Sequence, residues 1–321
     1  MECAGEGLDE VLFELYNALD RIAAPNKGTR GGNVELLGVA LRIANPRARV
    51  SRSEDRGKPF SALGELLWYL SGSDTLEFIR QYVPRYEEDA EDGVLYGAYG
   101  PRLFSMRGGV DQISNVLRLL RARPTTRRAV IQLFNAEDIA AEHREIPCTT
   151  TIQLHGRGDL LHMSVTMRSN DAYWGLPHDI FCFTMIQEMM ARALGLEVGE
   201  YYHYAGSMHV YDDYIGAMRQ YVDEGHQRAI EMPPMPLGDP FSSIPILLMA
   251  EDRIRHGEEV SAGDLFEHPY WQDIVRLLQA YWAGGAGKLD SLQDELADPI
   301  YRSFIDGRRS FRPRQTLTRP S

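Results

Sequence analysis

Side chains of the types used in covalent catalysis are concentrated in one stretch of the sequence, residues 147–211. They are Cys148, Arg168, Asp171, Asp179, His209 and Tyr211. A cysteine thiolate is a nucleophile, and cations near it lower the pKa of the thiol. An arginine can donate two parallel hydrogen bonds to one phosphate. The stretch therefore indicates nucleophilic chemistry on a phosphorylated substrate, with a buried core cysteine as the common alternative for Cys148.

The pattern around this stretch predicts the elements that position it. Residues 150–154 and 161–166 are strand-like runs, and residues 180–194 are a helical run. We expect the polar residues to lie where strands end and a helix begins. At such points the backbone leaves side chains facing a cleft.

Length and composition limit the classes of function. The chain has 321 residues, of which 44% are hydrophobic and 25% charged, as is typical of a globular protein with a large core. A net charge of −12 argues against non-specific binding to duplex DNA, although a few local arginines suffice for one phosphate. We expect a single domain over residues 1–321, with a divergent C-terminal region from about residue 230.

Cysteine usage and hydropathy indicate the compartment. Only Cys3, Cys148 and Cys182 are present, without a CxxC pair, which is typical of free thiols in a reducing cytoplasm and gives no metal site. No apolar run approaches the ~18 residues of a membrane helix, and the acidic N-terminus does not resemble a signal peptide. We therefore expect a cytoplasmic protein whose partners include neither nucleic acid nor membrane.

Several other segments have a readable periodicity. The spacing of apolar residues predicts helices over 8–23, 61–71, 111–121 and 269–284, and strands over 34–43, 129–134 and 246–250. Glu65 lies inside the second helix among apolar neighbours, and a buried carboxylate needs partners or a task. Tyr96 and Tyr99 close an acidic segment and are expected in a pocket wall.

Two basic segments have alternative interpretations. Arg127 and Arg128 end a compact basic turn, where arginines are either solvated or bind a phosphate. The Gly-rich segment 25–33 carries Lys27 and Arg30. It is either a plain hairpin turn or a mobile loop whose arginine reaches a phosphate.

Short motifs follow one another in a recognisable order along the chain. They are Glu65–Trp68 (ELLW), Tyr99–Gly100, Arg127–Arg128, Pro147–Cys148, Arg168–Ser169 with Asp171, Gly175–Pro177 and His209–Tyr211. In this order and spacing, from about residue 30 to 215, the chain resembles the thymidylate synthase / deoxycytidylate hydroxymethylase family. The resemblance implies an α+β fold of the thymidylate synthase type, a mixed β-sheet flanked by helices, and a sheet-mediated homodimer.

The resemblance also implies roles around the base and sugar of a pyrimidine nucleoside monophosphate. Cys148 would add to C6 of the ring, which turns the weakly nucleophilic C5 into an enamine-like carbon. Glu65 and Tyr99 would organise water and protons around the base. His209 and Tyr211 would hold the 3′-hydroxyl of the sugar.

Further implied roles concern the phosphate and the co-substrate. Arg168 and Ser169 would bind the phosphate, together with Arg30, for which Lys27 is the alternative. Arg127 and Arg128 would reach the phosphate in the other subunit's site. The one-carbon donor would be 5,10-methylenetetrahydrofolate, a reduced folate. Its contacts would be with Asp171, which hydrogen-bonds the pterin, and with Tyr86 and Gly175.

Asp179 is the most informative departure from the synthases, which carry asparagine at this position. The amide of asparagine matches N3–H and O4 of uracil. Cytosine presents the opposite edge, with an acceptor at N3 and a donor amine at C4. A carboxylate can accept from the amine and stabilise N3 as it gains a proton. Aspartate here resembles the cytidylate hydroxymethylases of the family, and retained uracil specificity is the alternative.

Other departures argue against methyl transfer. Thr149 replaces a histidine, Ser207 an aspartate, and Tyr86 falls near a folate-stacking tryptophan, while the tail 311–321 is polar. The sequence thus predicts a one-carbon transferase, a cytidine-monophosphate 5-hydroxymethylase, with CMP favoured over dCMP. The Arg-rich, Lys-poor composition suggests a GC-rich bacterium, and the resemblance to CMP hydroxymethylases implies an antibiotic pathway. The alternatives are a thymidylate synthase that methylates dUMP and a catalytically silent nucleotide- or RNA-binding regulator.

Overall fold

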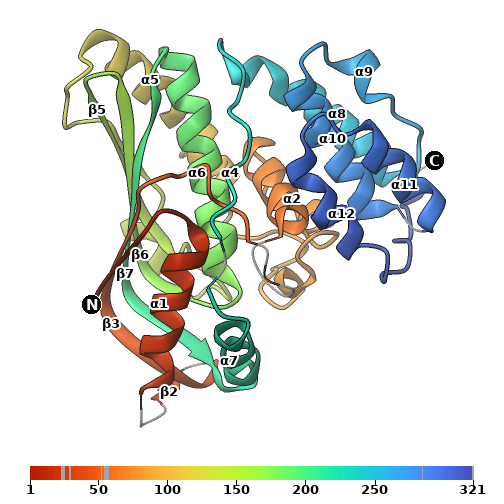
Figure 1. The fold of residues 1–321 in the computed structure, drawn as a ribbon. Coiled ribbons are helices and arrows are strands. Elements are labelled where there is room, and N and C mark those ends of the chain that lie inside the picture. Colours follow the sequence, from red (N-terminus) through yellow and green to blue (C-terminus); the bar gives the residue numbers. More distant parts are fainter. Residues whose placement is uncertain are drawn as a thin grey trace.

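The computed structural model describes residues 1–22, 26–28, 30–51, 53, 58–226, 228–283 and 285–319. In these residues a seven-stranded sheet has the order β1-β3-β7-β6-β5-β4, with β2 paired to β3 (Figure 1). The pairs β1–β3 and β6–β7 are parallel and the others antiparallel, so the sheet is mixed as expected. The strands are Glu2–Gly5 (β1), Asn26–Gly28 (β2), Gly31–Ile43 (β3), Val130–Gln132 (β4), Thr149–Arg157 (β5), Leu160–Asp171 (β6) and Glu197–Tyr211 (β7).

Helices occupy much of the remaining chain. The α-helices are Leu8–Asp20 (α1), Pro59–Leu70 (α2), Leu76–Ile79 (α3), Tyr99–Phe104 (α4), Gln112–Ala122 (α5), Gly175–Leu194 (α6), Ile215–Asp223 (α7), Ile244–Arg255 (α8), Ala262–Leu265 (α9), Pro269–Trp282 (α10), Ala286–Glu295 (α11) and Arg302–Gly307 (α12). Short 3₁₀ turns are Pro84–Glu87 (η1), Ala136–Ile139 (η2), Asp212–Tyr214 (η3), Pro240–Ser243 (η4) and Pro299–Tyr301 (η5). The predicted helices are confirmed, and together with the mixed sheet they confirm the α+β class.

The predicted strand over 246–250 is wrong, because this run lies inside α8. Pro245 occupies the first turn of the helix, a position where its missing N–H costs no hydrogen bond. Glu251 pairs with Arg255 one turn later, and Ile244, Leu247 and Ile254 are buried at helical spacing. The apolar run was too short to distinguish the two periods by itself.

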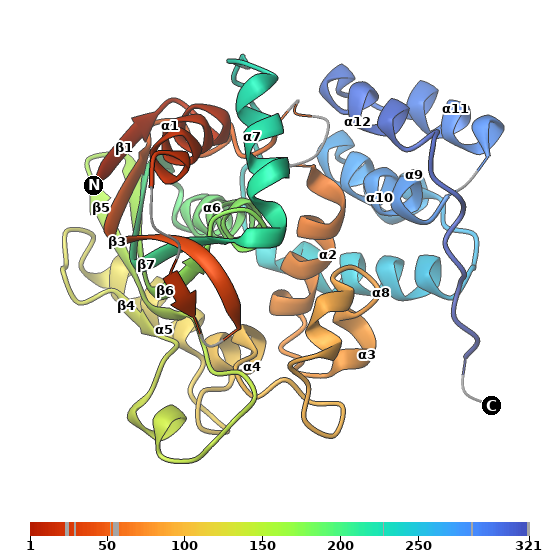
Figure 2. The same ribbon diagram turned by 90° about the horizontal axis from the view of Figure 1, so that it is seen from below.

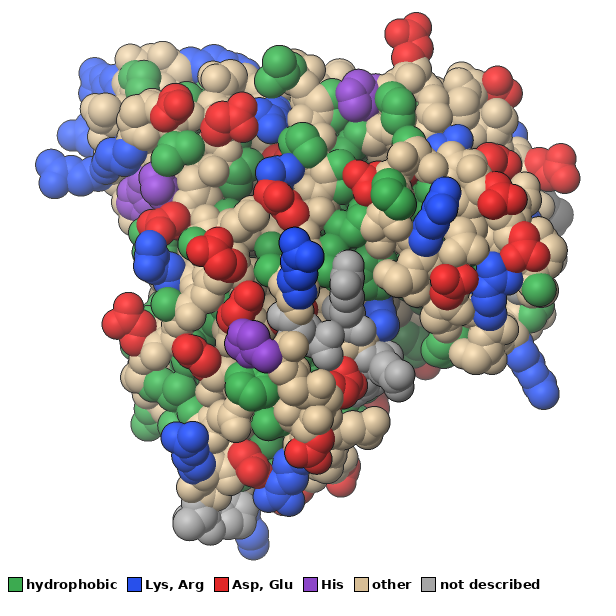
Figure 3. Space-filling view, in the orientation of Figure 1, with side chains coloured by type: hydrophobic (Ala, Val, Ile, Leu, Met, Phe, Trp, Pro, Cys, Tyr) green, Lys and Arg blue, Asp and Glu red, His purple; other side chains and the backbone are tan. Residues whose placement is uncertain are grey.

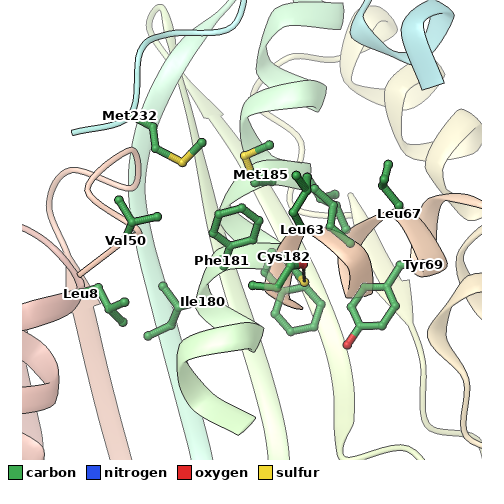
Figure 4. Packing of buried hydrophobic residues seen from close by; sticks show 14 of the residues in the cluster. Leu8, Val50, Leu63, Leu67, Tyr69, Ile180, Phe181, Cys182, Met185 and Met232 are labelled. Atoms are coloured by element: carbon green, nitrogen blue, oxygen red, sulfur yellow. Dashed lines mark hydrogen bonds between the residues drawn. The ribbon is translucent and has the colours of Figure 1, made fainter. Parts of the chain in front are cut away.

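Helix α6 is the core of the molecule. It lies between the sheet and α2, and residues of both α6 and α2 pack there, among them Phe181, Met185 and Leu63 (Figure 4). Because both sides of α6 are covered, buried residues occur all around it. Gly195 ends the helix in the left-handed region at φ 70°, which glycine adopts without strain.

The layers run from the sheet through α6 and α2 to the C-terminal helices α8 and α10–α12 (Figures 1 and 2). Some large side chains of β3 and β7 are exposed, with Leu37 at 72% and Tyr202 and Tyr204 also accessible. Figure 3 shows acidic and basic side chains interspersed over one face of the molecule. Among the described residues, the structure has no helix with the length and apolar character needed to cross a bilayer.

Candidate active site

One large pocket contains most of the residues singled out from the sequence. Those that line it are Arg30, Glu65, Tyr86, Tyr99, Cys148, Arg168, Ser169, Asp171, Gly175, Asp179, His209 and Tyr211. They come from the residues directly before β3 and β5, from α2, η1 and α4, and from the end of β6, the first turns of α6 and the end of β7. The volume of about 1520 Å³ exceeds the 300–1,000 Å³ typical of a site for one small ligand. The pocket therefore has room for two substrates.

Cys148 stands at the pocket wall directly before β5. Nη2 of Arg168 lies 3.7 Å from its Sγ, and the same guanidinium donates to the backbone oxygens of Pro147 and Ile146 at 2.9 Å each. Arg168 therefore holds the cysteine segment as well as facing the sulfur. Desolvation raises the pKa of the thiol to about 11, against the opposing effect of the Arg168 charge. In the unliganded protein Cys148 is consequently a protonated thiol.

Tyr99 contacts the residue that follows the nucleophile candidate. Its hydroxyl oxygen accepts hydrogen bonds from the backbone N–H of Thr149 at 3.1 Å and from the Thr149 hydroxyl at 2.9 Å. Burial raises the pKa of Tyr99 well above its ordinary value. The phenol thus keeps its own proton, which it can donate into the pocket.

Glu65 is buried at 4% exposure, and both of its carboxylate oxygens have hydrogen-bond partners. One carboxylate oxygen accepts from the hydroxyls of Tyr69 at 2.9 Å and Tyr86 at 2.7 Å, and the other lies 2.7 Å from Nδ1 of His178. The other ring nitrogen of His178 is 3.0 Å from the Ser61 hydroxyl. Burial alone would raise the pKa of Glu65, but His178 and the tyrosines hold it below its ordinary value. An ionised carboxylate is therefore stabilised here.

The pKa of Asp179, in the first turns of α6, is shifted in the direction opposite to that of Glu65. Burial and the charge of Glu65 raise its pKa well above the ordinary value. Its Oδ2 accepts a hydrogen bond of 2.8 Å from Nδ2 of Asn170. Oδ1 of Asn170 is in turn 2.9 Å from Nε2 of His203, whose Nδ1 is 2.9 Å from the Tyr201 hydroxyl. The two pocket carboxyls thus have separate environments, and their pKa values are shifted in opposite directions.

Asp171 lies at the end of β6, next to His209 in the register of β6 and β7. Its Oδ1 accepts from the backbone N–H groups of Tyr173 and Trp174 at 2.9 and 3.0 Å. Arg85 approaches Oδ2 at 3.5 Å and lies 5.4 Å above the ring of Tyr211. Arg85 therefore links Asp171, expected at the folate, with Tyr211, expected at the sugar.

The basic residues expected at the phosphate have different environments. Arg30 lines the pocket and pairs with Asp89 at 2.5 Å, which supports Arg30 over Lys27, an exposed residue of β2 outside the lining. Arg127 and Arg128 are exposed and lie outside the pocket of the single chain. Their expected role needs a second subunit.

Ser207 and Tyr96, both singled out from the sequence, lie outside the lining. The Ser207 hydroxyl donates to Glu35 on β3. Tyr96 stacks on the His143 ring with centroids 3.5 Å apart, and it is His143 that lines the pocket. The polar tail does not line the pocket either, since Arg314 packs over the ring of Tyr281.

Four pocket residues were missed from the sequence: His178, Asn170, Arg85 and Glu145. His178 and Asn170 directly precede Asp179 and Asp171, which were singled out. In the fold His178 contacts Glu65, and Asn170 contacts Asp179. Glu145 accepts from the backbone N–H of Gly97 at 3.0 Å, and its charge acts against ionisation of Cys148. Arg85 lies in the short turn η1 and Glu145 in a segment without regular structure, and neither run is long enough for periodicity to give a direction.

Comparison with known proteins places this geometry in context. The model of the thymidylate synthase family matches residues 57–243 of this chain. The chain is 32% identical to the deoxyuridylate hydroxymethyltransferase of Bacillus phage SP01, over 65% of this chain and 59% of that protein. It is 30% identical to the thymidylate synthase of Bacillus phage phi3T, over 70% of this chain and 81% of that protein. A thymidylate synthase of Francisella philomiragia is 30% identical over 48% of this chain and 62% of its own length.

Proposed function

Because the chain belongs to the thymidylate synthase family, we propose that it is a one-carbon transferase acting as a cytidine-monophosphate 5-hydroxymethylase. The observation that carries the proposal is Asp179, a buried carboxyl in the pocket whose pKa is raised. A protonated carboxyl can donate to N3 of cytosine, and its oxygens can accept from the exocyclic amine. The name of the phage SP01 relative supports hydroxymethyl transfer, and names a uracil nucleotide as that protein's substrate.

The nucleotide would bind with its phosphate at Arg168, Ser169 and Arg30 and its sugar at His209 and Tyr211. The base then lies against Cys148, whose sulfur attacks C6 after the thiol proton passes through water to the ionised Glu65 and its hydrogen-bond partners. The nearby guanidinium of Arg168 stabilises the developing thiolate. The addition makes C5 nucleophilic towards the one-carbon unit. Loss of the C5 proton then allows the folate nitrogen to leave, and departure of the Cys148 sulfur from C6 at the end restores the aromatic ring.

The second substrate would occupy the remaining volume beside Asp171, Gly175 and Tyr86. When bound there, 5,10-methylenetetrahydrofolate supplies the one-carbon unit that C5 attacks. The residues fit a pterin, because Asp171 offers a carboxylate held in place by two backbone N–H groups. Ionised Glu65, with His178 and two tyrosine hydroxyls, can accept and return protons through water around the base.

Attack by water, rather than by hydride, on the C5 methylene would give the hydroxymethyl product. Hydride transfer requires the folate to stay against the methylene with water excluded. The hydroxyl of Tyr86 donates to Glu65. Tyr86, which is expected beside the folate, is therefore part of a polar network. Glu65 is thereby placed to orient a water molecule.

A homodimer completes this proposal. Tyr202 and Tyr204 are exposed on β7, beside the ion pair of Arg42 and Glu200, and aromatic side chains of this kind are common where a surface packs against a second copy. Pairing through this surface would bring Arg127 and Arg128 of one subunit to the phosphate of the other. For the sugar of the nucleotide we favour ribose over deoxyribose, that is CMP over dCMP, on the composition of the chain.

Two alternatives remain. A thymidylate synthase acting on dUMP is favoured by the names of the Bacillus phage phi3T and Francisella relatives. A silent nucleotide- or RNA-binding regulator would have no need of Cys148, Arg168 and Asp179 in one pocket. Single-turnover formation of a covalent Cys148 adduct separates a silent protein from an enzyme.

Product analysis tests the proposal directly. The protein is incubated with methylenetetrahydrofolate and CMP, dCMP, UMP or dUMP in ¹⁸O water, and products are identified by mass spectrometry. We expect 5-hydroxymethyl-CMP with oxygen from solvent, and tetrahydrofolate as the folate product. A methylated base with stoichiometric dihydrofolate, seen by absorbance, would contradict the assignment, and a tenfold preference for dCMP would reverse the choice of sugar.

A further inference from the structure

Behind Asp179 lies a buried chain of hydrogen bonds that has no role in the scheme above. It runs from Tyr201 to His203, Asn170 and Asp179, with distances of 2.9, 2.9 and 2.8 Å between successive polar atoms. Tyr201, His203 and Asn170 are 0%, 1% and 3% exposed. Each link therefore forms away from water, where an unpaired polar group is costly.

The direction of donation along this chain is fixed by its members. Burial lowers the pKa of His203 to about 3, so the imidazole is neutral and only one ring nitrogen carries a proton. Asn170 turns its oxygen to Nε2 of His203, so that nitrogen must be the donor. Nδ1 is then an acceptor, and the Tyr201 hydroxyl donates to it. All the bonds therefore point from Tyr201 towards Asp179.

Because Asn170 donates, Oδ2 of Asp179 is occupied as an acceptor. Gly175 closes the same side, since a Cβ there would lie 3.1 Å from Nδ2 of Asn170 and 3.5 Å from Oδ2 of Asp179. Asp179 lines the pocket, and among the described residues Oδ1 has no hydrogen-bond partner. Oδ1 is thus the oxygen that carries the carboxyl proton towards a ligand, and Oδ2 keeps a second lone pair that can accept from the exocyclic amine.

We propose that Asn170 is a positioning residue for base selection, an inference that rests on the proposed function. By holding Oδ2 of Asp179, Asn170 reserves Oδ1 and the carboxyl proton for N3 of cytosine. As sulfur bonds to C6, the C5=C6 electron pair moves to C4=C5 and the C4=N3 pair moves onto N3. N3 takes the proton from Oδ1, and Asp179 becomes a carboxylate. Atoms and charge balance, since the thiolate charge ends on Asp179.

Uracil does not fit this arrangement equally well. Its N3 already carries a hydrogen and its addition product places charge on O4, so a proton on Oδ1 faces a donor. Without Asn170, Oδ2 loses its fixed partner and the carboxyl can present either oxygen. The preference for cytosine then falls, although no contact with the ligand has been removed.

The experiment compares wild type with Asn170→Ala, and with Asn170→Ser, which keeps a small hydrogen-bonding group if the alanine variant does not fold. Gln187→Ala is the matched control. Gln187 is a buried amide on the same helix as Asp179, and it bonds the backbone oxygens of Leu161 and Gly199 instead. Thermal melting establishes that each protein is folded. Two readouts are taken: the ratio of kcat/KM for CMP to that for UMP, and the ¹⁵N resonance of [3-¹⁵N]CMP bound without folate.

In wild type we expect preference for CMP and an N3 resonance shifted towards that of protonated cytosine. Asn170→Ala should lower the CMP/UMP ratio about tenfold or more and reverse that shift, while Gln187→Ala changes neither. Asn170→Ser should fall between them. A wild type that prefers CMP, with an unchanged ratio and N3 resonance in the Asn170 variants, overturns the inference alone. A wild type that neither binds nor converts CMP overturns the proposed function and this inference together.

Discussion

The reactivity of Cys148 in the unliganded protein is open to a quantitative test. Its pKa is raised from 9.0 to about 11. Because each pH unit changes the thiolate fraction tenfold, Cys148 should be alkylated about a hundredfold more slowly near neutral pH than a thiol of ordinary pKa. A raised thiol pKa means that reactivity increases with pH. The rate should therefore still be rising at pH 9, where an ordinary thiol begins to level off.

Replacing Arg168 removes the cation 3.7 Å from the sulfur. Two charges at about that distance interact by about 1 kcal/mol in water and about 4 kcal/mol at an effective dielectric constant of about 20. Because the Arg168 side chain is exposed and water screens its charge, we take the lower figure, for which Arg168→Leu should slow alkylation about fivefold. Arg168→Lys keeps the charge and is the control, although it cannot hold both backbone oxygens that arginine binds.

The assay is iodoacetamide labelling between pH 7 and 10.5, with peptide mapping by mass spectrometry. Mapping is needed because Cys3 and Cys182 are also free thiols, though only 1% and 0% exposed. Cys148→Ala identifies the labelled peptide, and circular dichroism checks that the Arg168 variants are folded. A labelling rate that levels off below pH 8.5, or one that is unaffected by Arg168→Leu, would refute the electrostatic reasoning.

Three further predictions concern specificity, assembly and stability. Asp179→Asn should shift the cytosine/uracil ratio of kcat/KM towards uracil by tenfold or more, since an unpaired polar edge costs ~1–3 kcal/mol. Mixing inactive Cys148→Ala and Arg127→Ala subunits after unfolding should restore activity to about one quarter of wild type if sites are shared across a dimer, and not otherwise. Arg49→Met leaves Glu188 buried without its partner, and urea titration should show a loss of about 3 kcal/mol or more.

The location of the pocket could be predicted because its motifs are short, ordered and attached to regular elements. Arg168, Asp171 and Asp179 lie at the end of a strand and the start of a helix, where the expected cleft is found. Helix α6 begins at Gly175, five residues before the predicted run, because Gly175 and Pro177 obscured the apolar spacing of its first turn.

Interactions between distant segments could not be predicted. The contact between Asn170 and His203 depends on the parallel register of β6 and β7, which a single strand's pattern does not contain. The same holds for Glu65 and His178, which meet only because α2 and α6 pack together. The periodicity of one element gives the side that faces the core, but a polar partner on another element is chosen by tertiary packing.

Helix α2 is held on its far side by helices that follow the region matched by the family model. The ring of Tyr82 lies against Gly64, where a Cβ would approach it to 2.1 Å, and stacks on Tyr281 of α10 at 4.9 Å. Its hydroxyl donates to Glu251 of α8. Gly64 is the neighbour of Glu65, and α8 and α10 lie beyond the region matched by the family. A substitution in α8 or α10 can thus move α2, and with it Glu65, without altering any residue that lines the pocket.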